Sequence, residues 1–251
     1  MHIMIKMKNK LLRIILLYLN TTCIILTYGY SAQVDWNNIE KKKDLFYEKS
    51  KDTPFSGQVL GLQEGKIIRG KKEGEFFKFY KNGNKLSRMI YKNNKLNGLS
   101  YEYYRNGNLL SKKNYIDNKL EGEYFDYYSF GQLLSRRFYV NGKLNGKYLS
   151  FYKNGQLKSK SNYKLGKLDG EYLIYHEYEL EKIIQLKEKK NYKNGKLNGN
   201  YFQYHENGKI KSKSFYNLAR LEGEFLKFDR LGKLIEKIIY LDGVYVRKIK
   251  F

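Results

Sequence analysis

Apolar and polar residues alternate along most of this chain with a period of two. Counted from the glycine that opens each of seven repeats, the third and fifth following residues are apolar or aromatic, and the residue between them is mostly polar. Alternation of this kind is typical of a strand with one face half-buried. The apolar pairs are Phe77 and Phe79, Tyr101 and Tyr103, Phe125 and Tyr127, Leu149 and Phe151, Leu173 and Tyr175, Phe202 and Tyr204, and Leu226 and Phe228.

The alternation itself recurs every 24 residues. The opening glycines are Gly74, Gly98, Gly122, Gly146, Gly170, Gly199 and Gly223, and the closing tyrosines are Tyr91, Tyr115, Tyr139, Tyr163, Tyr192, Tyr216 and Tyr240. A fixed period of this length indicates stacked repeats, in which each unit buries its apolar face against its neighbours. We therefore expect one elongated array.

Most repeats contain two turn signals, although the first turn glycine is missing between Gly170 and Gly195. The first is a dipeptide such as Asn106-Gly107 or Asn154-Gly155, and the second is a dipeptide such as Asn141-Gly142 or Asn194-Gly195. Asn-Gly between alternating segments predicts a type I′ hairpin turn, because both of its residues tolerate positive φ. The predicted fold is all-β: an elongated antiparallel β-meander of 24-residue units forming a single twisted sheet.

The chain divides into three predicted parts. Residues 1–32 are expected to be a signal peptide, residues 33–53 a lysine-rich lead-in with at most one short strand, and residues 54–251 the array. The array is predicted to start with a degenerate unit over residues 54–73. The longer step between Gly170 and Gly199 predicts a protruding hairpin insertion over about residues 177–190.

The N-terminal segment has the pattern of a secretory signal. Four basic residues precede a mostly apolar run from Ile14 to Tyr28, and small residues follow it. We expect cleavage near Ser31 or Ala32 and an exported protein at the cell surface, in the periplasm or secreted. An uncleaved anchor, or a cytoplasmic protein if the segment is not a signal, is the alternative. Cys23 is the only cysteine, so the chain after cleavage has no disulfide and no thiolate metal site.

The chain is strongly basic, with 49 Lys and Arg residues against 25 Asp and Glu residues. Basic residues recur at fixed repeat positions, and stacking places each set in a row with about 10 Å between neighbours. The first row is Arg88, Lys112, Arg136, Lys160, Lys213 and Lys237, and the second is Lys95, Lys119, Lys143, Lys167, Lys196 and Arg220. With Tyr80, Tyr104, Tyr128 and Tyr152 these rows form the candidate binding surface for an acidic partner. A solubilising surface without a specific partner is the alternative.

The sequence offers little catalytic chemistry. His176 and His205 stand where other repeats have tyrosine, which favours replacement of a surface aromatic residue over metal ligation. Glu75, Glu123, Glu171 and Glu224 follow opening glycines, and this repetition predicts ion pairs with neighbouring lysines. We expect no enzymatic activity, no cofactor and no metal.

The repeats resemble the variant MORN repeats of bacterial proteins, a group described as YwqK-type antitoxins. The resemblance rests on G-x-Y/F-x-x-Y/F-Y-x-N-G-x-L-x-S followed by Y-x-N-G-K-L-x-G, which is met most fully from Gly98 to Asn118, from Gly146 to Gly170 and from Tyr192 to Gly208. It covers roughly residues 44–246. It implies an extended sheet that binds partners, with no shared catalytic residues.

We therefore expect a non-enzymatic, exported or envelope-associated repeat protein that binds an acidic protein or an anionic envelope polymer. The first alternative is a cytoplasmic antitoxin-like protein that caps a toxin, as the resemblance implies. The second is a peripheral scaffold on an anionic membrane surface. Nucleic acid fits poorly with export, and the chain lacks the usual nucleic-acid-binding motifs.

Overall fold

The computed structural model describes residues 32–178 and 185–251, and their regular secondary structure is almost entirely β-strand. The chain divides into two compact units, with the boundary between Phe76 and Phe77 inside strand β6 (Lys71–Phe79). None of the helices within the described ranges is long and apolar enough to cross a membrane. The predicted signal peptide lies outside these ranges except for its last residue, Ala32, and so remains a prediction.

The first unit contains more secondary structure than predicted, because the lead-in of residues 33–53 holds several elements and not at most one short strand. Its elements before β6 are β1 (Ala32–Asp35), the 3-10 helix η1 (Trp36–Asn38), β2 (Ile39–Lys42), β3 (Leu45–Glu48), β4 (Gly57–Leu60) and β5 (Gln63–Ile68). Strand β1 pairs in parallel with β4, so the prediction of a purely antiparallel sheet is wrong here. The long connection through the β2–β3 hairpin permits this parallel pairing. Gly57 is required because a Cβ atom there would collide with the carbonyl oxygen of Ala32.

The buried apolar side chains of the described residues all belong to this first unit. They are Ile39, Phe55, Val59, Ile67 and Phe76. The lead-in and the degenerate repeat therefore share one small hydrophobic core, which the repeats of the second unit lack.

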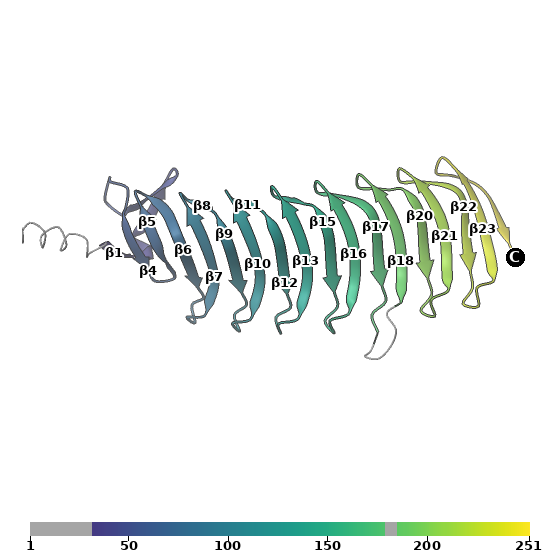
Figure 1. Ribbon diagram of the computed structural model, residues 1–251, viewed down its shortest axis with the longest axis horizontal. Helices are drawn as coiled ribbons and strands as arrows, with labels where there is room; N and C mark the ends of the chain where they lie inside the picture. The colour runs from purple at the N-terminus through teal and green to yellow at the C-terminus, as the bar shows by residue number, and fades with distance from the viewer. Residues whose placement is uncertain (1–31, 179–184) are drawn as a thin grey trace, which may run out of the picture. The chain divides into compact units, whose positions relative to one another are not determined.

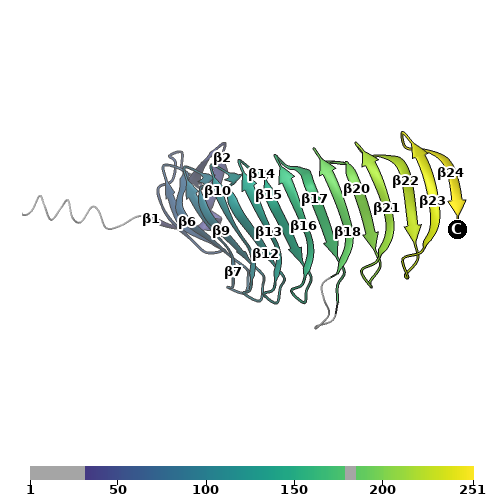
Figure 2. The same ribbon diagram turned by 45° about the vertical axis from the view of Figure 1, so that its right-hand side comes forward.

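In the second unit the strands lie side by side in chain order, as Figures 1 and 2 show from two directions. The first strands of the hairpins are β9 (Gly98–Tyr103), β12 (Gly122–Tyr127), β15 (Gly146–Phe151), β17 (Lys167–Tyr175), β20 (Gly199–Tyr204) and β22 (Arg220–Phe228). The second strands are β7 (Lys85–Lys92), β10 (Leu109–Ile116), β13 (Leu133–Val140), β16 (Leu157–Lys164), β18 (Leu186–Lys193), β21 (Ile210–Asn217) and β23 (Leu234–Leu241). The last strand is β24 (Val244–Lys250), and the two-residue strands are β8 (Lys95–Leu96), β11 (Lys119–Leu120), β14 (Lys143–Leu144) and β19 (Lys196–Leu197).

Pairing within this unit is antiparallel throughout, as predicted. A typical second strand, β10, pairs with β9 and the short β11 of its own repeat and then with β12 of the next. The short strand β11 pairs in one register and β12 in another, because the chain bulges at the opening glycine Gly122, whose φ is positive. The 24-residue repeat is thus a hairpin plus a bulged connection, and the predicted repeat fold is confirmed.

The prediction of a type I′ turn at the first dipeptide is wrong. Only the glycine has positive φ there: Gly107 lies at +89°, and Asn106 has negative φ. The Gly107 N–H donates to the carbonyl oxygen of Tyr104, and the Tyr104 N–H donates to the carbonyl oxygen of Asn108. This is the three-residue loop in which a type I turn is followed by a glycine bulge. It explains why Phe130 and Leu231 replace the asparagine elsewhere, because that position needs no positive φ.

The type I′ turns lie at the second dipeptide of each repeat. Both residues have positive φ in Asn141-Gly142 and even in Leu218-Ala219. These turns also link neighbouring repeats, since the Gly142 N–H donates to the carbonyl oxygen of Leu120 and the Asn141 N–H donates to Oε2 of Glu121. The same pair of hydrogen bonds joins later repeats, so this edge of the sheet is fixed through both backbone and side chains.

The two faces of the second unit differ in burial. The aromatic face carries the fourteen apolar residues at the third and fifth positions, and all of them are half-buried. The opposite face, here called the serine face, carries the most buried side chains of this unit: Ser87, Ser100, Ser111, Lys113, Ser135, Ser161, Ser212 and Ser214. Tyrosine pairs such as Tyr148 and Tyr163, with ring centroids 6.1 Å apart, lie beside the serines. Small polar residues are therefore the most enclosed part of the array.

The predicted insertion is shorter than expected. Strands β17 and β18 stay paired up to Tyr175 and Leu186, and the His176 N–H donates to the carbonyl oxygen of Gln185. The residues from 186 to 190 therefore belong to the regular sheet, because they pair with β17 and β20. The extra residues fall between His176 and Gln185, largely outside the described ranges.

Candidate functional site: cations on the aromatic face

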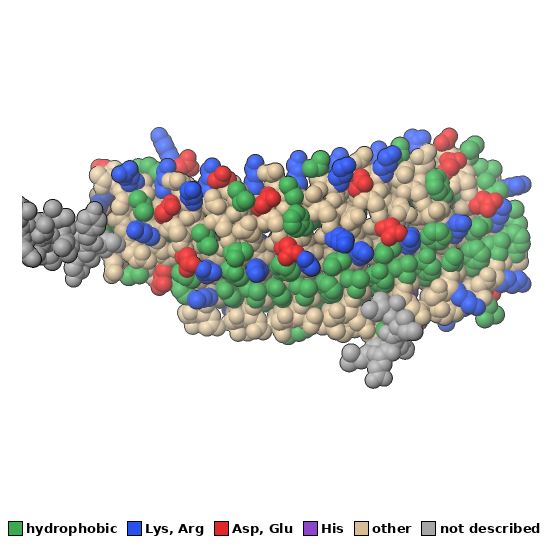
Figure 3. Space-filling model, viewed as in Figure 1, with side chains coloured by type: hydrophobic (Ala, Val, Ile, Leu, Met, Phe, Trp, Pro, Cys, Tyr) green, Lys and Arg blue, Asp and Glu red, His purple; other side chains and the backbone are tan. Residues whose placement is uncertain are grey.

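The first predicted row of cations lies on the aromatic face. Each cation stands opposite apolar residues on its two neighbouring strands: Lys160, for example, pairs with Leu149 on β15 and with Leu173 on β17. The guanidinium of Arg136 lies 5.8 Å from the ring centroid of Phe125, and Lys213 Nζ lies 5.8 Å from that of Phe202. Figure 3 shows charged side chains along the border of a continuous hydrophobic band. The row therefore combines charge with an apolar surface.

This row contains a residue that the sequence analysis missed. Lys189 on β18 pairs with Leu173 and Phe202, which places it between Lys160 and Lys213. Counting forward from the opening glycine fails there because of the insertion. Counting back three residues from the closing tyrosine, Tyr192, would have found it, as it finds every other member.

Carboxylates accompany some of these cations, as predicted. Ion pairs join Glu123 to Arg136, Glu171 to Lys189, and Glu224 to Lys237. These glutamates are about half exposed, so each pair contributes little to stability. The hydrogen bond from Lys189 to Glu171 raises the pKa of Lys189 above its usual value. Beside the Glu123 pair, Lys147, Leu149 and neighbouring residues line an open depression of about 390 Å³.

The second predicted row lies elsewhere, at the edge formed by the type I′ turns. Its members Lys95, Lys119, Lys143, Lys167, Lys196 and Arg220 are all exposed. Lys95 Nζ lies 3.6 Å from Oδ1 of Asp117 in the turn of the next repeat. The structure therefore separates the two rows: one lies on a sheet face and the other along an edge.

The four predicted tyrosines lie at the opposite edge and serve the fold. The hydroxyl groups of Tyr80, Tyr104, Tyr128 and Tyr152 donate hydrogen bonds of 2.8 to 3.0 Å to main-chain carbonyl oxygens of Tyr103, Tyr127, Phe151 and Tyr175 in the next repeats. Nε2 of His205 lies 3.1 Å from the carbonyl oxygen of Phe228, so this histidine takes the tyrosine's place. These aromatic residues form a ladder that joins successive repeats.

The serine face holds charged pairs of its own. Lys113 is only 8% exposed, and its Nζ lies 2.9 Å from Oε1 of Glu102. Burial alone would lower the pKa of Lys113, but the hydrogen bond to Glu102 and nearby tyrosines outweigh it, so the pKa is raised. Asp126 pairs with Arg137, and Glu188 with Lys190, in the same way. Sequence reasoning missed these ion pairs because the residues at their positions differ in chemical type from one repeat to the next.

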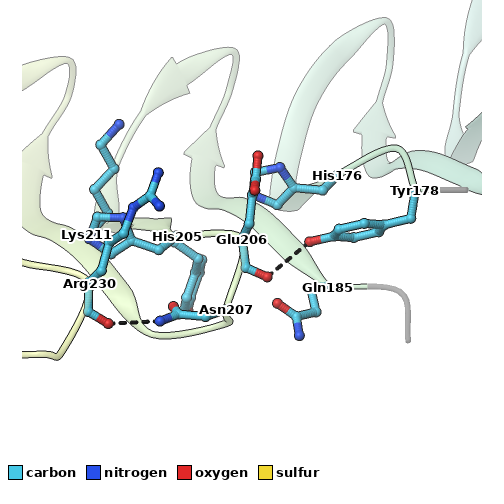
Figure 4. A pocket seen from close by; sticks show the side chains of 9 residues that line it. His176, Tyr178, Gln185, His205, Glu206, Asn207, Lys211 and Arg230 are labelled. Atoms are coloured by element: carbon cyan, nitrogen blue, oxygen red, sulfur yellow. Dashed lines mark hydrogen bonds between the residues drawn. The ribbon is translucent and has the colours of Figure 1, made fainter. Parts of the chain in front are cut away.

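A depression of about 620 Å³ lies where the tyrosine ladder is interrupted (Figure 4). His176 occupies the tyrosine position there, and the hydroxyl group of Tyr178 makes the link to the next repeat by donating to the carbonyl oxygen of Glu206. Nε2 of His176 and Oε1 of Gln185 are buried and make no hydrogen bond to any described residue. Within the described ranges, His, Cys, Asp and Glu side chains form no group of three that could hold a metal ion.

The second unit is a β-hairpin repeat array with a row of cations on one face. The family model described as MORN repeat variant matches residues 72–93, 96–117, 120–141, 144–165 and 197–218. Five stretches of the chain therefore match the variant MORN repeat, and together they cover somewhat less than half of its length. MORN repeats generally bind proteins or membrane lipids. No curated protein matches the chain.

Proposed function

We propose that this protein is an exported, non-enzymatic MORN-repeat protein whose aromatic face binds an acidic partner. The observation that carries the proposal is the row of cations from Arg88 to Lys237. Every described repeat of the second unit places one basic side chain at the same position beside half-buried aromatic or aliphatic residues. Such a row attracts anionic groups over a long distance, and its apolar border adds contact area.

The ion pairs of the repeated glutamates favour a binding role over catalysis. The glutamates at the repeat position pair with basic side chains in similar surroundings, as in Glu123 with Arg136 and Glu224 with Lys237. Acid–base catalysis by two carboxylates requires environments that separate their pKa values. Because each glutamate on this face has the same surroundings, we expect their carboxylates to have similar pKa values, which does not suit acid–base catalysis.

Export is supported by the sequence of residues 1–32. Cleavage at Ser31 or Ala32 removes at most the first residue of β1, so the folded units would persist after processing. The mass and the cellular fraction of the endogenous protein test this part. We expect a chain starting near Ala32 outside the cytoplasm. A full-length cytosolic chain would contradict export and would favour the YwqK-type antitoxin, which relief of toxicity by co-expression would then test.

The acidic partner is tested with defined probes. The processed protein is mixed with a glutamate-rich peptide, with an anionic polysaccharide, and with vesicles containing 30% phosphatidylserine, at about 50 and 300 mM salt. We expect the peptide to bind at low salt and to weaken strongly at high salt. Binding to the vesicles alone would replace the proposal by a peripheral membrane role, and salt-independent binding would contradict the electrostatic basis.

A further inference from the structure

The repeats of the second unit alternate between two kinds. The residues on both sides of the opening glycine are acidic in one kind, the acidic repeats, and non-acidic in the other, the non-acidic repeats. The acidic repeats carry Glu121 and Glu123, Asp169 and Glu171, and Glu222 and Glu224. The non-acidic repeats carry Asn97 and Leu99, Asn145 and Lys147, and Asn198 and Asn200. The true period of this surface is therefore two repeats.

The residue before the glycine has the same structural role in both kinds. Oε2 of Glu121 and Oδ1 of Asn145 each accept a hydrogen bond from a backbone N–H of the next type I′ turn. The sheet therefore needs an oxygen there but no charge. The alternation between acidic and non-acidic repeats therefore does not change the hydrogen bonds of the sheet at this position.

The residue after the glycine makes that difference on the aromatic face. In acidic repeats its carboxylate pairs with the row cation, which is Arg136, Lys189 or Lys237. In non-acidic repeats the row cation is Lys112, Lys160 or Lys213, and none of these forms an ion pair with a carboxylate of the described residues. Within this row of cations, uncompensated positive charge thus recurs at every second repeat.

The spacing of this charge follows from the sheet. Lys112 lies on β10, Lys160 on β16 and Lys213 on β21, and four strand steps separate one from the next when the two-residue strands are not counted. With about 4.8 Å between strands, successive uncompensated lysines are roughly 19 Å apart. An extended polypeptide covers that distance in about six residues, and residues six apart point to the same side.

We propose that the partner, assuming the acidic ligand of the proposed function, is an extended segment of a protein with acidic residues about every sixth position. Its carboxylates pair with Lys112, Lys160 and Lys213. The intervening residues are apolar and lie over the aromatic face near Phe125 and Leu173.

A polypeptide fits this surface better than a uniform polyanion. A nucleic acid or a polyphosphate carries charge at every few ångströms, and part of it would face Glu123, Glu171 and Glu224. Like charges at these positions weaken binding. Only a polypeptide can alternate acidic and apolar residues with the period that the lysines require.

The test uses fluorescent peptides with equal numbers of glutamates, placed at every sixth or at every fourth residue among serine and valine. Fluorescence anisotropy with the processed protein measures their affinities. We expect the six-residue peptide to bind about fivefold more tightly or better, since it makes at least one more ion pair. The variant K160Q should lose most of this preference.

A second variant tests the alternation directly. The substitutions Glu123→Gln, Glu171→Gln and Glu224→Gln affect half-exposed side chains and release the other row cations. Positive charge then recurs at about 10 Å, so we expect the preference for six-residue spacing to disappear. Circular dichroism confirms that the sheet is retained.

The outcomes separate the two claims. If wild type binds both peptides equally and salt weakens the binding, the spacing inference is wrong and the acidic partner stands. If neither peptide binds, both claims fail. If the triple glutamine variant keeps the six-residue preference, the alternation of ion pairs does not set the spacing, and the inference is overturned.

Discussion

The hydroxyl group of Tyr104 donates a 2.8 Å hydrogen bond to the main-chain carbonyl oxygen of Tyr127, one repeat further along the chain. The same link recurs along the edge of the sheet. A part-buried hydrogen bond of this kind contributes about 0.5–1.5 kcal/mol. Tyr104→Phe should therefore lower the free energy of unfolding by about that amount, measured by urea denaturation. Tyr103→Phe is the control, because that hydroxyl group makes no hydrogen bond to the described residues, and an equal loss in both variants would contradict the ladder.

The turn at Leu218-Ala219 is the least favourable type I′ turn of the array. Its residues lie at φ +47° and +73°, a region that disfavours side chains other than asparagine and aspartate. Replacement by Asn-Gly should raise the free energy of unfolding by about 0.5–1.5 kcal/mol. Thermal unfolding measures the change. The reverse replacement, Leu-Ala for Asn194-Gly195, should destabilise, and a neutral result for both would show that these turns carry no strain.

The pair of Glu102 and Lys113 differs from the pairs of the aromatic face by its burial. Lys113 is 8% exposed and Glu102 supports it with a 2.9 Å contact. Glu102→Gln leaves an enclosed ammonium without its counter-charge, so we expect a loss of about 1–3 kcal/mol in the free energy of unfolding. Glu123→Gln removes a carboxylate from an exposed pair and should cost less than about 1 kcal/mol. Equal losses would mean that the serine face is as well hydrated as the other.

Stability should decline at alkaline pH. Burial raises the pKa of Tyr163, Tyr201 and Tyr216 above the ordinary 10.0. A raised folded-state pKa gives stability that is complete below the unfolded value and is lost as pH rises through the folded value. The free energy of unfolding should thus be insensitive to these groups near neutrality and fall above about pH 10. Tyr163→Phe should make the decline shallower; an unchanged slope would show that this tyrosine is not protected.

The repeat could be predicted from the sequence because every unit contains the same independent features. Alternation, opening glycine and closing tyrosine agree in seven repeats, so the strands and their antiparallel order follow. The prediction of a type I′ turn at the first dipeptide is wrong because Asn-Gly suits both a type I′ turn and a type I turn with a glycine bulge. The two turn types can be told apart in the sequence only from less regular dipeptides such as Phe130-Gly131, where a bulky residue stands at a position that a type I′ turn would require to have positive φ.

The functional surface could be predicted only in part. Equal repeat positions gave the first cation row, but charge alone could not separate it from the exposed row at the turns. The role of the tyrosine ladder depends on hydrogen bonds to the next repeat, such as that of Tyr152 to Tyr175. The carbonyl groups that accept these hydrogen bonds belong to the next repeat, so the residue pattern within one repeat does not reveal them. The parallel strand β1 was missed because it pairs with β4, which lies far along the chain.

The most direct test of the account compares two variants of equal charge. One carries Lys112→Gln, Lys160→Gln and Lys213→Gln on the aromatic face, and the other carries Lys119→Gln, Lys143→Gln and Lys196→Gln at the turn edge. Their affinities for the same glutamate-rich peptide are measured by anisotropy at low salt. We expect the first variant to lose at least tenfold in affinity and the second to stay within about twofold of wild type. Equal losses would mean that only net charge attracts the ligand, and would contradict a binding site on the aromatic face.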